Sequence, residues 1–205
     1  MTRRFTRLRF LRCAVIALTI GVLVAVFGAP SAAYADGNFR WQNSWNGSYL
    51  EVLYSSTDAT ARVITYPLNT SSANQVWHDH QLSDGYFYLM NLNSAMVLDR
   101  WDYGYTYIWP DATGPTCSQG MQYYWTDQTW QHWGYRSVWD TWDDRYYTFW
   151  INKYGCAGNP YHDVLSVPLA GSAPSMTWTT LYPEDYCSDQ RYGPSAMCYW
   201  KRNGQ

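Results

Sequence analysis

Residues 39–52 read F-R-W-Q-N-S-W-N-G-S-Y-L-E-V, and residues 87–100 read F-Y-L-M-N-L-N-S-A-M-V-L-D-R. The two stretches begin 48 residues apart and align without a gap. They share an aromatic residue, an asparagine, a leucine and an acid, at Phe39/Phe87, Asn43/Asn91, Leu50/Leu98 and Glu51/Asp99. A repeat of this length indicates a fold that assembles several copies of one supersecondary unit.

Each copy is followed by a Gln-x-Trp motif, at Gln75–Trp77 and at Gln128–Trp130, and the two motifs are 53 residues apart. Residues 146–152 echo the strand that opens each copy, and Trp178 ends a degraded third motif, Met-Thr-Trp. The chain between these motifs consists of short aromatic or alternating runs separated by Gly, Asn, Ser and Asp. Such runs are typical of strands, so the sequence predicts an all-β domain.

Three repeats, each with a strand, an Asn, a small-residue turn, Leu-Asp and Gln-x-Trp, resemble the ricin-type lectin domain. The resemblance covers about residues 39–182 and weakens from the first repeat to the third. It implies a β-trefoil of three pseudo-symmetric repeats, with the third repeat degenerate. It also implies a structural role for the motif residues, the Trp in the core and the Gln bonded to loop backbone: Gln75, Trp77, Gln128, Trp130 and Trp178.

The same resemblance implies where sugar would bind. In such domains an acid after the Leu accepts hydrogen bonds from hydroxyls, an aromatic ring further along stacks on the sugar, and an Asn before Gln-x-Trp adds a polar contact. These roles fall on three residues of repeat one and three of repeat two: Glu51, Tyr66 and Asn74, then Asp99, Trp109 and Asp127. The third repeat has no Leu-Asp, so no working site is expected there. The competing interpretation is that both acids only cap turns.

The first 35 residues have the order of a secretory signal peptide. A basic start is followed by the apolar run 14–29, then Pro30 and the small-residue sequence Ala33-Tyr34-Ala35. This order predicts cleavage before Asp36, rather than an uncleaved anchor, because the apolar run is shorter than the ~20 residues that span a bilayer. We therefore expect a secreted protein with a trefoil over residues 36–182 and a C-terminal, disulfide-bearing extension over 183–205.

Cysteine usage agrees with export. Four cysteines follow the expected cleavage point, and an oxidising compartment would pair them in one of three ways. The favoured pairing is Cys117–Cys156 with Cys187–Cys198, because the second pair closes a short loop near the C-terminus. No C-x-x-C spacing supports the alternative of a cysteine metal site.

The net charge and the aromatic content restrict the classes of molecule that the chain can bind. After residue 35 the chain has nine basic and 16 acidic residues, a net charge of −7 that argues against nucleic acid and anionic membranes. The same segment contains 13 Trp, 19 Tyr and 3 Phe, more rings than one small core can bury with every polar ring atom bonded. Some rings must lie at the surface, where flat amphipathic side chains can stack on sugars.

The sequence offers no catalytic machinery. No G-x-S-x-G, P-loop or G-x-G-x-x-G motif is present, and the two glutamates and the adjacent acidic pairs do not form a recognisable glycosidase dyad. His78 and His80 would lie on one face of a strand, where they could hold a metal, but no third ligand is apparent and no metal or cofactor is predicted.

The function that the sequence favours is non-catalytic binding of neutral carbohydrate, of a galactose, xylose or arabinose type. The main alternative is the receptor-binding or delivery component of a secreted toxin, which would act through protein contacts. A secreted protease inhibitor or a small hydrolase of unfamiliar type fits the sequence less well. No membrane insertion is expected after signal removal.

Overall fold

The computed structural model describes residues 36–101, 118–140, 145–154, 162–167, 176–184, 187 and 195–204. Three sets of predictions lie outside these residues: the signal peptide 1–35, the stacking role of Trp109, and the disulfide Cys117–Cys156. Among the described residues, no helix has the length and apolar character needed to cross a membrane.

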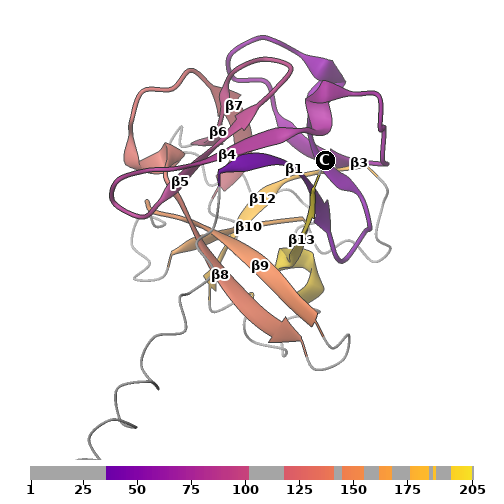
Figure 1. The fold of residues 1–205 in the computed structure, drawn as a ribbon, viewed down its shortest axis with the longest axis vertical. Helices are drawn as coiled ribbons and strands as arrows, with labels where there is room; N and C mark the ends of the chain where they lie inside the picture. Colours follow the sequence, from indigo (N-terminus) through magenta and orange to yellow (C-terminus); the bar gives the residue numbers. More distant parts are fainter. Residues whose placement is uncertain are drawn as a thin grey trace, which may run out of the picture. The chain divides into compact units, whose positions relative to one another are not determined.

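The strands form three lobes in sequence order (Figure 1). The first lobe consists of β1 (Gly37–Asn43), β2 (Tyr49–Val52), β3 (Val63–Tyr66) and β4 (Trp77–Gln81). The second consists of β5 (Phe87–Asn91), β6 (Val97–Trp101), β7 (Ser118–Tyr123) and β8 (Trp133–Asp140). The third consists of β9 (Arg145–Asn152), β10 (Asp163–Ser166), β11 (Thr177–Trp178), β12 (Thr180–Pro183) and β13 (Trp200–Gly204). Short 3-10 helices are η1 (Leu53–Ser55), η2 (Ala73–Gln75), η3 (Thr129–Gln131) and η5 (Ser195–Cys198).

The first and last strands of the three lobes close into a barrel. Antiparallel pairing runs from β1 to β4, β5, β8, β9 and β13 in turn, and β13 returns to β1. The inner strands of each lobe make hairpins beside the barrel, β2–β3, β6–β7 and β10–β12. Neighbouring hairpins are joined by β3–β11 and β7–β12 pairing. The chain is therefore a β-trefoil, as predicted.

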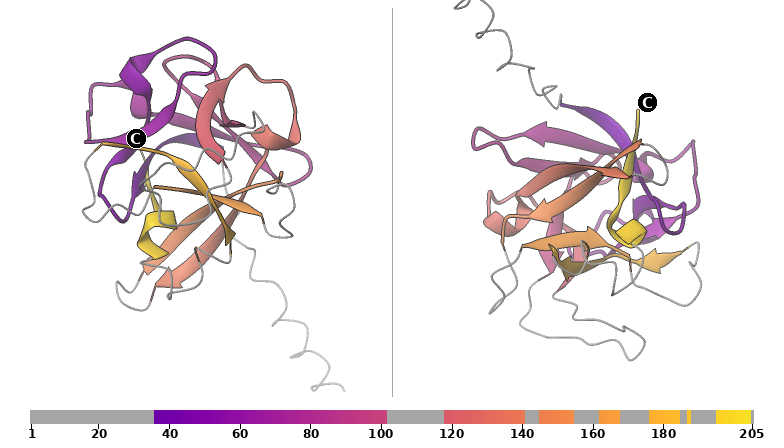
Figure 2. Two further views of the ribbon diagram at one scale, coloured as in Figure 1. Left: turned by 180° about the vertical axis from the view of Figure 1, so that it is seen from behind. Right: turned by 90° about the horizontal axis from the view of Figure 1, so that it is seen from below.

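Barrel closure depends on residues that the sequence places after the trefoil. Residues 200–204 were expected in a C-terminal extension, but they form β13, and Phe39 lies opposite Gly204 in the β1–β13 pair. The C-terminus consequently lies beside β1, as two views of the ribbon show (Figures 1 and 2). The third lobe thus extends well beyond residue 182.

Alternation of side chains explains why these short runs form strands. In β5 the burial pattern alternates, with Phe87, Leu89 and Asn91 inside and Tyr88 and Met90 partly exposed. Successive side chains of a strand point to opposite faces, so every second residue enters the core. The barrel core is aromatic, and the Trp150 ring lies edge-on to Trp41, with 4.9 Å between ring centroids.

An asparagine at the end of each lobe's first strand anchors the turn that follows. Asn43, Asn91 and Asn152 each accept a hydrogen bond at Oδ1 from the backbone N–H two residues later. Each also donates from Nδ2 to a backbone carbonyl of the preceding lobe in the ring of three: Asn43 to Met197 O, Asn91 to Asn74 O and Asn152 to Trp130 O. Small residues suit these turns because Gly47 and Ala95 adopt the left-handed conformation.

Three buried tryptophans define the equivalent motif positions. Their indole N–H groups donate to the carbonyl of the leucine that precedes each acid position, from Trp77 to Leu50 O, Trp133 to Leu98 O and Trp200 to Leu165 O. The second and third structural tryptophans are therefore Trp133 and Trp200, which corrects the prediction of Trp130 and Trp178. Trp130 is half-buried and packs edge-on to Tyr154, whereas Trp178 is half-buried beneath the Arg62 guanidinium.

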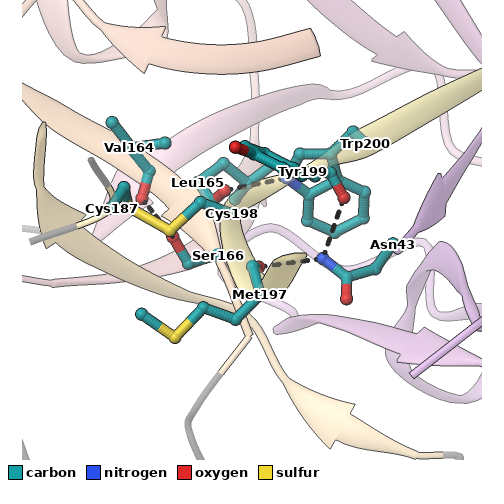
Figure 3. Close-up of a disulfide and its surroundings, with 9 residues drawn as sticks. All are labelled: Asn43, Val164, Leu165, Ser166, Cys187, Met197, Cys198, Tyr199 and Trp200. Atoms are coloured by element: carbon teal, nitrogen blue, oxygen red, sulfur yellow. Dashed lines mark hydrogen bonds between the residues drawn. A yellow bond between two sulfur atoms is a disulfide. The ribbon is translucent and has the colours of Figure 1, made fainter. Parts of the chain in front are cut away.

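A disulfide occupies the place of the glutamine in the third lobe. Cys198 stands two residues before Trp200, as Gln75 stands before Trp77, and it is bonded to Cys187 (Figure 3). Ser166 follows Leu165 as the acids follow their leucines, and its hydroxyl donates to Cys198 Sγ at 3.2 Å. The disulfide thus connects the motif position of the third lobe to the preceding chain, as the glutamine side chains do by hydrogen bonds in the other two lobes.

Candidate functional site

Each of the first two lobes holds a buried acid paired with a glutamine. Glu51 in β2 and Asp99 in β6 occupy equivalent positions in their lobes, and both side chains are almost fully buried. Gln75 Nε2 donates to Glu51 Oε2 at 2.8 Å, and Gln131 Nε2 donates to Asp99 Oδ2 at 2.8 Å. Gln131, rather than the predicted Gln128, is therefore the motif glutamine of the second lobe. The Gln128 side chain is exposed and donates from Nε2 to Thr126 O at 3.2 Å.

The same glutamines hold the loops that precede them. Gln75 Nε2 also donates to Pro67 O at 2.8 Å, and its Oε1 accepts the Asn69 N–H at 2.8 Å. Gln131 repeats this arrangement with Tyr124 O at 2.7 Å and the Thr126 N–H at 2.8 Å. Each glutamine thereby fixes its acid and its loop together, so the acid can be presented only in one geometry.

Burial changes the ionisation of both acids. Desolvation raises the pKa of Glu51, although hydrogen bonds from Gln75 and Asn74 oppose it. Desolvation raises the pKa of Asp99 further, to about 7, against the opposing hydrogen bond from Gln131. The raised pKa values follow from removing the carboxyl groups from water, which disfavours their charged form. Both acids therefore hold a proton more readily than a surface carboxyl.

Asn74 contributes an acceptor to the first lobe. Its side chain is buried in η2 and donates from Nδ2 to Val52 O at 2.7 Å. Its Oδ1 has no hydrogen-bond partner among the described residues, and neither does Asp99 Oδ1 in the second lobe. A buried acceptor without a donor is costly, so both atoms are suited to a hydroxyl brought by a ligand.

An aromatic ring accompanies the acid in each of the first two lobes. Tyr66 is 43% exposed and lies opposite Tyr49 in the β2–β3 hairpin, on the face that also carries Glu51. The register of the β6–β7 hairpin puts Tyr123, which is half-buried, at the equivalent position of the second lobe. Sequence reasoning missed Tyr123 because the long insert before it offered many other aromatic residues.

Asp127 does not stand where the resemblance placed it. The residue directly before the Gln of the second lobe is Trp130, whose carbonyl accepts the bond that Asn74 accepts in the first lobe. Asp127 lies on the loop in a left-handed backbone conformation, and its Oδ1 is 2.9 Å from His132 Nε2. The second lobe therefore lacks the amide that Asn74 supplies.

The third lobe lacks the polar set. Ser166 replaces the acid, Cys198 the glutamine and Met197 the asparagine. Tyr182, which corresponds to Tyr66 in the hairpin register, is buried. These replacements leave neither a carboxylate nor an exposed ring at the equivalent place.

The histidines of β4 have an acidic neighbour that the sequence did not reveal. His78 and His80 lie on one face of the strand, as predicted, and Asp36 joins them from the residue before β1. Asp36 Oδ2 is 2.8 Å from His80 Nδ1. Asp36 is remote from both histidines in sequence, so only the β1–β4 pairing brings the three together.

The corrected motif was visible in the sequence. Residues 128–133 read Q-T-W-Q-H-W and contain two consecutive Gln-x-Trp motifs, of which the second is the structural one. The first lies 53 residues after Gln75 and the second 56 residues after it, so spacing along the chain does not single out the structural one. Gln131 lies 32 residues after Asp99, whereas Gln75 lies 24 residues after Glu51, so the chain between acid and motif is eight residues longer in the second lobe.

Comparison with known proteins agrees with the geometry. Residues 27–108 match the family model for the ricin-type beta-trefoil lectin domain-like proteins. Among curated proteins, no sequence matches the chain.

Solved structures show the same fold. The designed three-fold symmetric protein ThreeFoil aligns over 83% of this chain and all of its own, at 20% identity and a TM-score of 0.57. A ricin B-like lectin of Macrolepiota procera, solved with lactose, aligns over 82% of this chain and 95% of its own, at 12% identity and a TM-score of 0.52. A mosquitocidal holotoxin aligns over 83% of this chain but only 17% of its own, at 13% identity and a TM-score of 0.61.

Proposed function

We propose, from a β-trefoil whose residues 27–108 carry the ricin-type lectin domain-like sequence, that this chain is a secreted, non-catalytic protein that binds neutral carbohydrate. The observation that carries the proposal is the pairing of a buried acid with a loop-fixing glutamine in two of the three lobes. The first lobe adds Asn74 Oδ1, an acceptor that has no hydrogen-bond partner among the residues that the structure describes, and an exposed ring, Tyr66.

The first lobe is the better-equipped site. Glu51 and Asn74 would accept hydrogen bonds from adjacent hydroxyls of a pyranose, and Tyr66 would stack on its apolar C–H face. Small adjustments at the rim would have to open the acid to the ligand, since Glu51 is almost fully buried. The side chain is one methylene longer than the aspartate of the second lobe, and this added reach favours contact with a ligand at the surface.

The second lobe would bind through Asp99 and an aromatic residue. Tyr123 is the ring that the hairpin register places there, and Trp109 stays a prediction outside the described residues. Without an amide equivalent to Asn74, this site would hold fewer hydroxyls and bind more weakly. Two shallow sites of unequal strength would rely on multivalent presentation for useful avidity.

Secretion and partner choice follow from charge and chemistry. Cleavage before Asp36 would release a chain of net charge −7 that carries the Cys187–Cys198 disulfide, which suits an oxidising compartment. A neutral glycan of galactose, xylose or arabinose type fits an acid-and-ring site better than a charged one. The lactose in the Macrolepiota procera lectin makes galactose-type glycans the first to test.

A glycan array probed with multivalent chain 36–205 tests the proposal. We expect selective binding that falls about tenfold or more in Glu51→Gln and in Tyr66→Ala, because each removes a direct contact. Tyr146→Ala is the matched control, since Tyr146 is an exposed tyrosine on β9 in the third lobe, whereas Glu51 lies in the first. Binding that survives Glu51→Gln, Tyr66→Ala and Asp99→Asn together would show that the sugar binds elsewhere.

A protein-binding role is the second candidate, and exposed aromatic residues favour it. Tyr124 and Trp125 are exposed on the loop after β7, and Trp139 packs edge-on to Tyr146 on the β8–β9 hairpin, where both are exposed. Tyr and Trp dominate the energetic centres of protein interfaces. A silent array with folded protein, together with capture of a partner by wild-type chain but not by Trp125→Ala, would favour this role.

A further inference from the structure

We propose that Asp36, His78 and His80 form a binding site for a divalent transition metal ion of the Zn²⁺ class. One ligand atom from each of the three side chains lies within 4.8 Å of the others. The three residues take no part in the acid and glutamine pairs of the proposed sugar sites, so the metal site is a separate feature of the same chain.

Strand pairing builds the cluster. His78 and His80 are two residues apart on β4, so both imidazoles project from one face. β1 pairs with β4 in the register Gly37↔Asp79 and Asn38↔His78. Continuing that register by one residue places Asp36 opposite His80. Strand pairing thus fixes both histidines, and Asp36 joins them from the residue directly before β1.

The distances suit closure around an ion. Asp36 Oδ2 lies 2.8 Å from His80 Nδ1, and the two imidazole rings are stacked with centroids 6.2 Å apart. Zn–N and Zn–O bonds are about 2.0–2.2 Å long, which puts the ligand atoms of a tetrahedral ion roughly 3.4 Å from one another. Partly exposed side chains can make the change of about 1.4 Å that this requires by rotation about their side-chain bonds.

Neighbouring groups already orient two of the ligands. His78 Nδ1 is 2.9 Å from Asn38 Oδ1, and a proton donated there would leave the Nε2 lone pair free for a metal. Asp36 Oδ1 accepts the Gln81 N–H at 2.8 Å, which leaves Oδ2 to face the histidines. This is the arrangement of outer hydrogen bonds that metal sites use to hold their ligands in place.

The proposed secretion adds a fourth ligand. If cleavage occurs before Asp36, the residue that supplies the carboxylate also carries the free α-amino group of the mature chain. An amine nitrogen and a β-carboxylate oxygen of one residue can bind the same ion as a six-membered chelate. This part of the inference rests on the proposed function, because it requires export and cleavage at that bond.

The ligand types decide the class of metal. Two imidazoles, a carboxylate and an amine are nitrogen-rich and suit Zn²⁺, Cu²⁺ or Ni²⁺, whereas Mg²⁺ and Ca²⁺ prefer oxygen. Asp36 is 43% exposed and His80 is 41% exposed, so an ion can enter from solvent. An open coordination position would be filled by water.

Calorimetric titration of ZnCl₂ into chelator-treated chain 36–205 tests the site. We expect one ion per chain, and a loss of affinity of about tenfold or more in His78→Asn and in His80→Asn. His162→Asn is the matched control, because His162 is exposed in a different lobe. Unchanged affinity in His80→Asn, or equal loss in His162→Asn, would overturn the proposal. Histidine ring signals in NMR spectra should shift for residues 78 and 80, and shifts confined to other histidines would also overturn it.

A second comparison isolates the α-amine. Chain that begins at Asp36 should bind Zn²⁺ about tenfold more tightly than chain preceded by Gly-Ser, since the extension converts the amine to an amide. Equal affinities would show that the three side chains hold the ion without the amine. Both outcomes are independent of the glycan array, so failure of the sugar proposal and failure of the metal proposal can be told apart.

Discussion

The buried carboxyl of Asp99 has a structural role in its lobe and a proposed role in sugar binding, and the two roles favour different protonation states. It accepts the Gln131 side-chain N–H and so helps to fix the loop, yet its burial disfavours the charged form of the carboxyl. In a lectin site the charged form would be the better acceptor for sugar hydroxyls. Because its pKa is about 7, Asp99 is only partly ionised near neutral pH, and ionising it lowers the free energy of unfolding.

We predict that Asp99 makes the folded chain more stable as the pH falls from 7 to 4. Because burial raises its pKa from 3.8 to about 7, the folded chain holds a proton through an interval in which the unfolded chain has released it. Stability from this residue is full below about pH 4 and declines as the pH rises to about 7. The difference corresponds to at most roughly 4 kcal/mol, with Glu51 acting in the same direction.

Thermal unfolding of wild type and Asp99→Asn between pH 4 and 8 measures this effect. Asparagine keeps an acceptor for Gln131 but cannot titrate. The melting temperature of wild type relative to the variant should therefore fall with rising pH and level off above pH 7. Parallel curves for the two proteins would contradict the raised pKa.

A second prediction separates the two tryptophans of the Q-T-W-Q-H-W stretch. Trp133→Phe removes the donor to Leu98 O in a fully buried place and should destabilise the fold by roughly 1–3 kcal/mol. Trp130→Phe is the matched control and should change stability by roughly 0.5 kcal/mol or less, because the side chain of Trp130 is half-buried. Urea denaturation gives both values, and a larger loss in Trp130→Phe would reverse the assignment.

At the scale of elements, each lobe needs a tie between its last hairpin loop and its motif. The first two lobes use a glutamine that bonds both the loop backbone and the acid. The third uses the Cys187–Cys198 disulfide, with Ser166 in hydrogen-bonding contact with Cys198. Where the glutamine is replaced by a cystine, the acid is replaced by Ser166. The third lobe therefore keeps the tie between motif and loop but has no acid to offer a ligand.

We predict that removing this disulfide destabilises the fold, and that a glutamine at position 198 restores part of the lost stability. Cys187→Ala with Cys198→Ala should cost roughly 2–4 kcal/mol, since the crosslink closes a loop between residues 11 apart. Cys187→Ala with Cys198→Gln should recover about 1 kcal/mol by bonding to Ser166 and the loop, as Gln75 does in the first lobe. Denaturant midpoints of the two variants test this, and equal midpoints would mean that the glutamine and cystine are not interchangeable.

At the scale of the whole molecule, the barrel is closed by its two ends. β13 pairs with β1 over five residue pairs and with β9 on its other side. An edge left open on either partner would expose unpaired backbone groups and promote association. The last strand is therefore part of the core architecture of the trefoil.

We predict that a chain ending at residue 199 does not fold cooperatively. It loses Trp200, which is fully buried, together with the strand that closes the barrel. Circular dichroism on heating should show no sharp transition, and the chain should bind a hydrophobic dye. Removal of Gln205 alone is the control and should leave the transition intact, whereas a sharp transition in the shorter chain would place residues 200–205 outside the fold.

The sequence by itself determined the succession of short strands, the asparagine turns and the positions of the Leu-acid pairs in the first two repeats, and its resemblance to ricin-type lectin domains implied the β-trefoil. The strands, turns and Leu-acid pairs are local features, because they are set by neighbours within one strand or turn. Only the tertiary structure decided that Gln131 and Trp133 form the second motif, that Cys198 stands for the third glutamine and that Asp36 meets the histidines of β4. Those assignments depend on pairing between distant strands across inserts of unequal length, and repeat spacing along the chain does not specify that pairing.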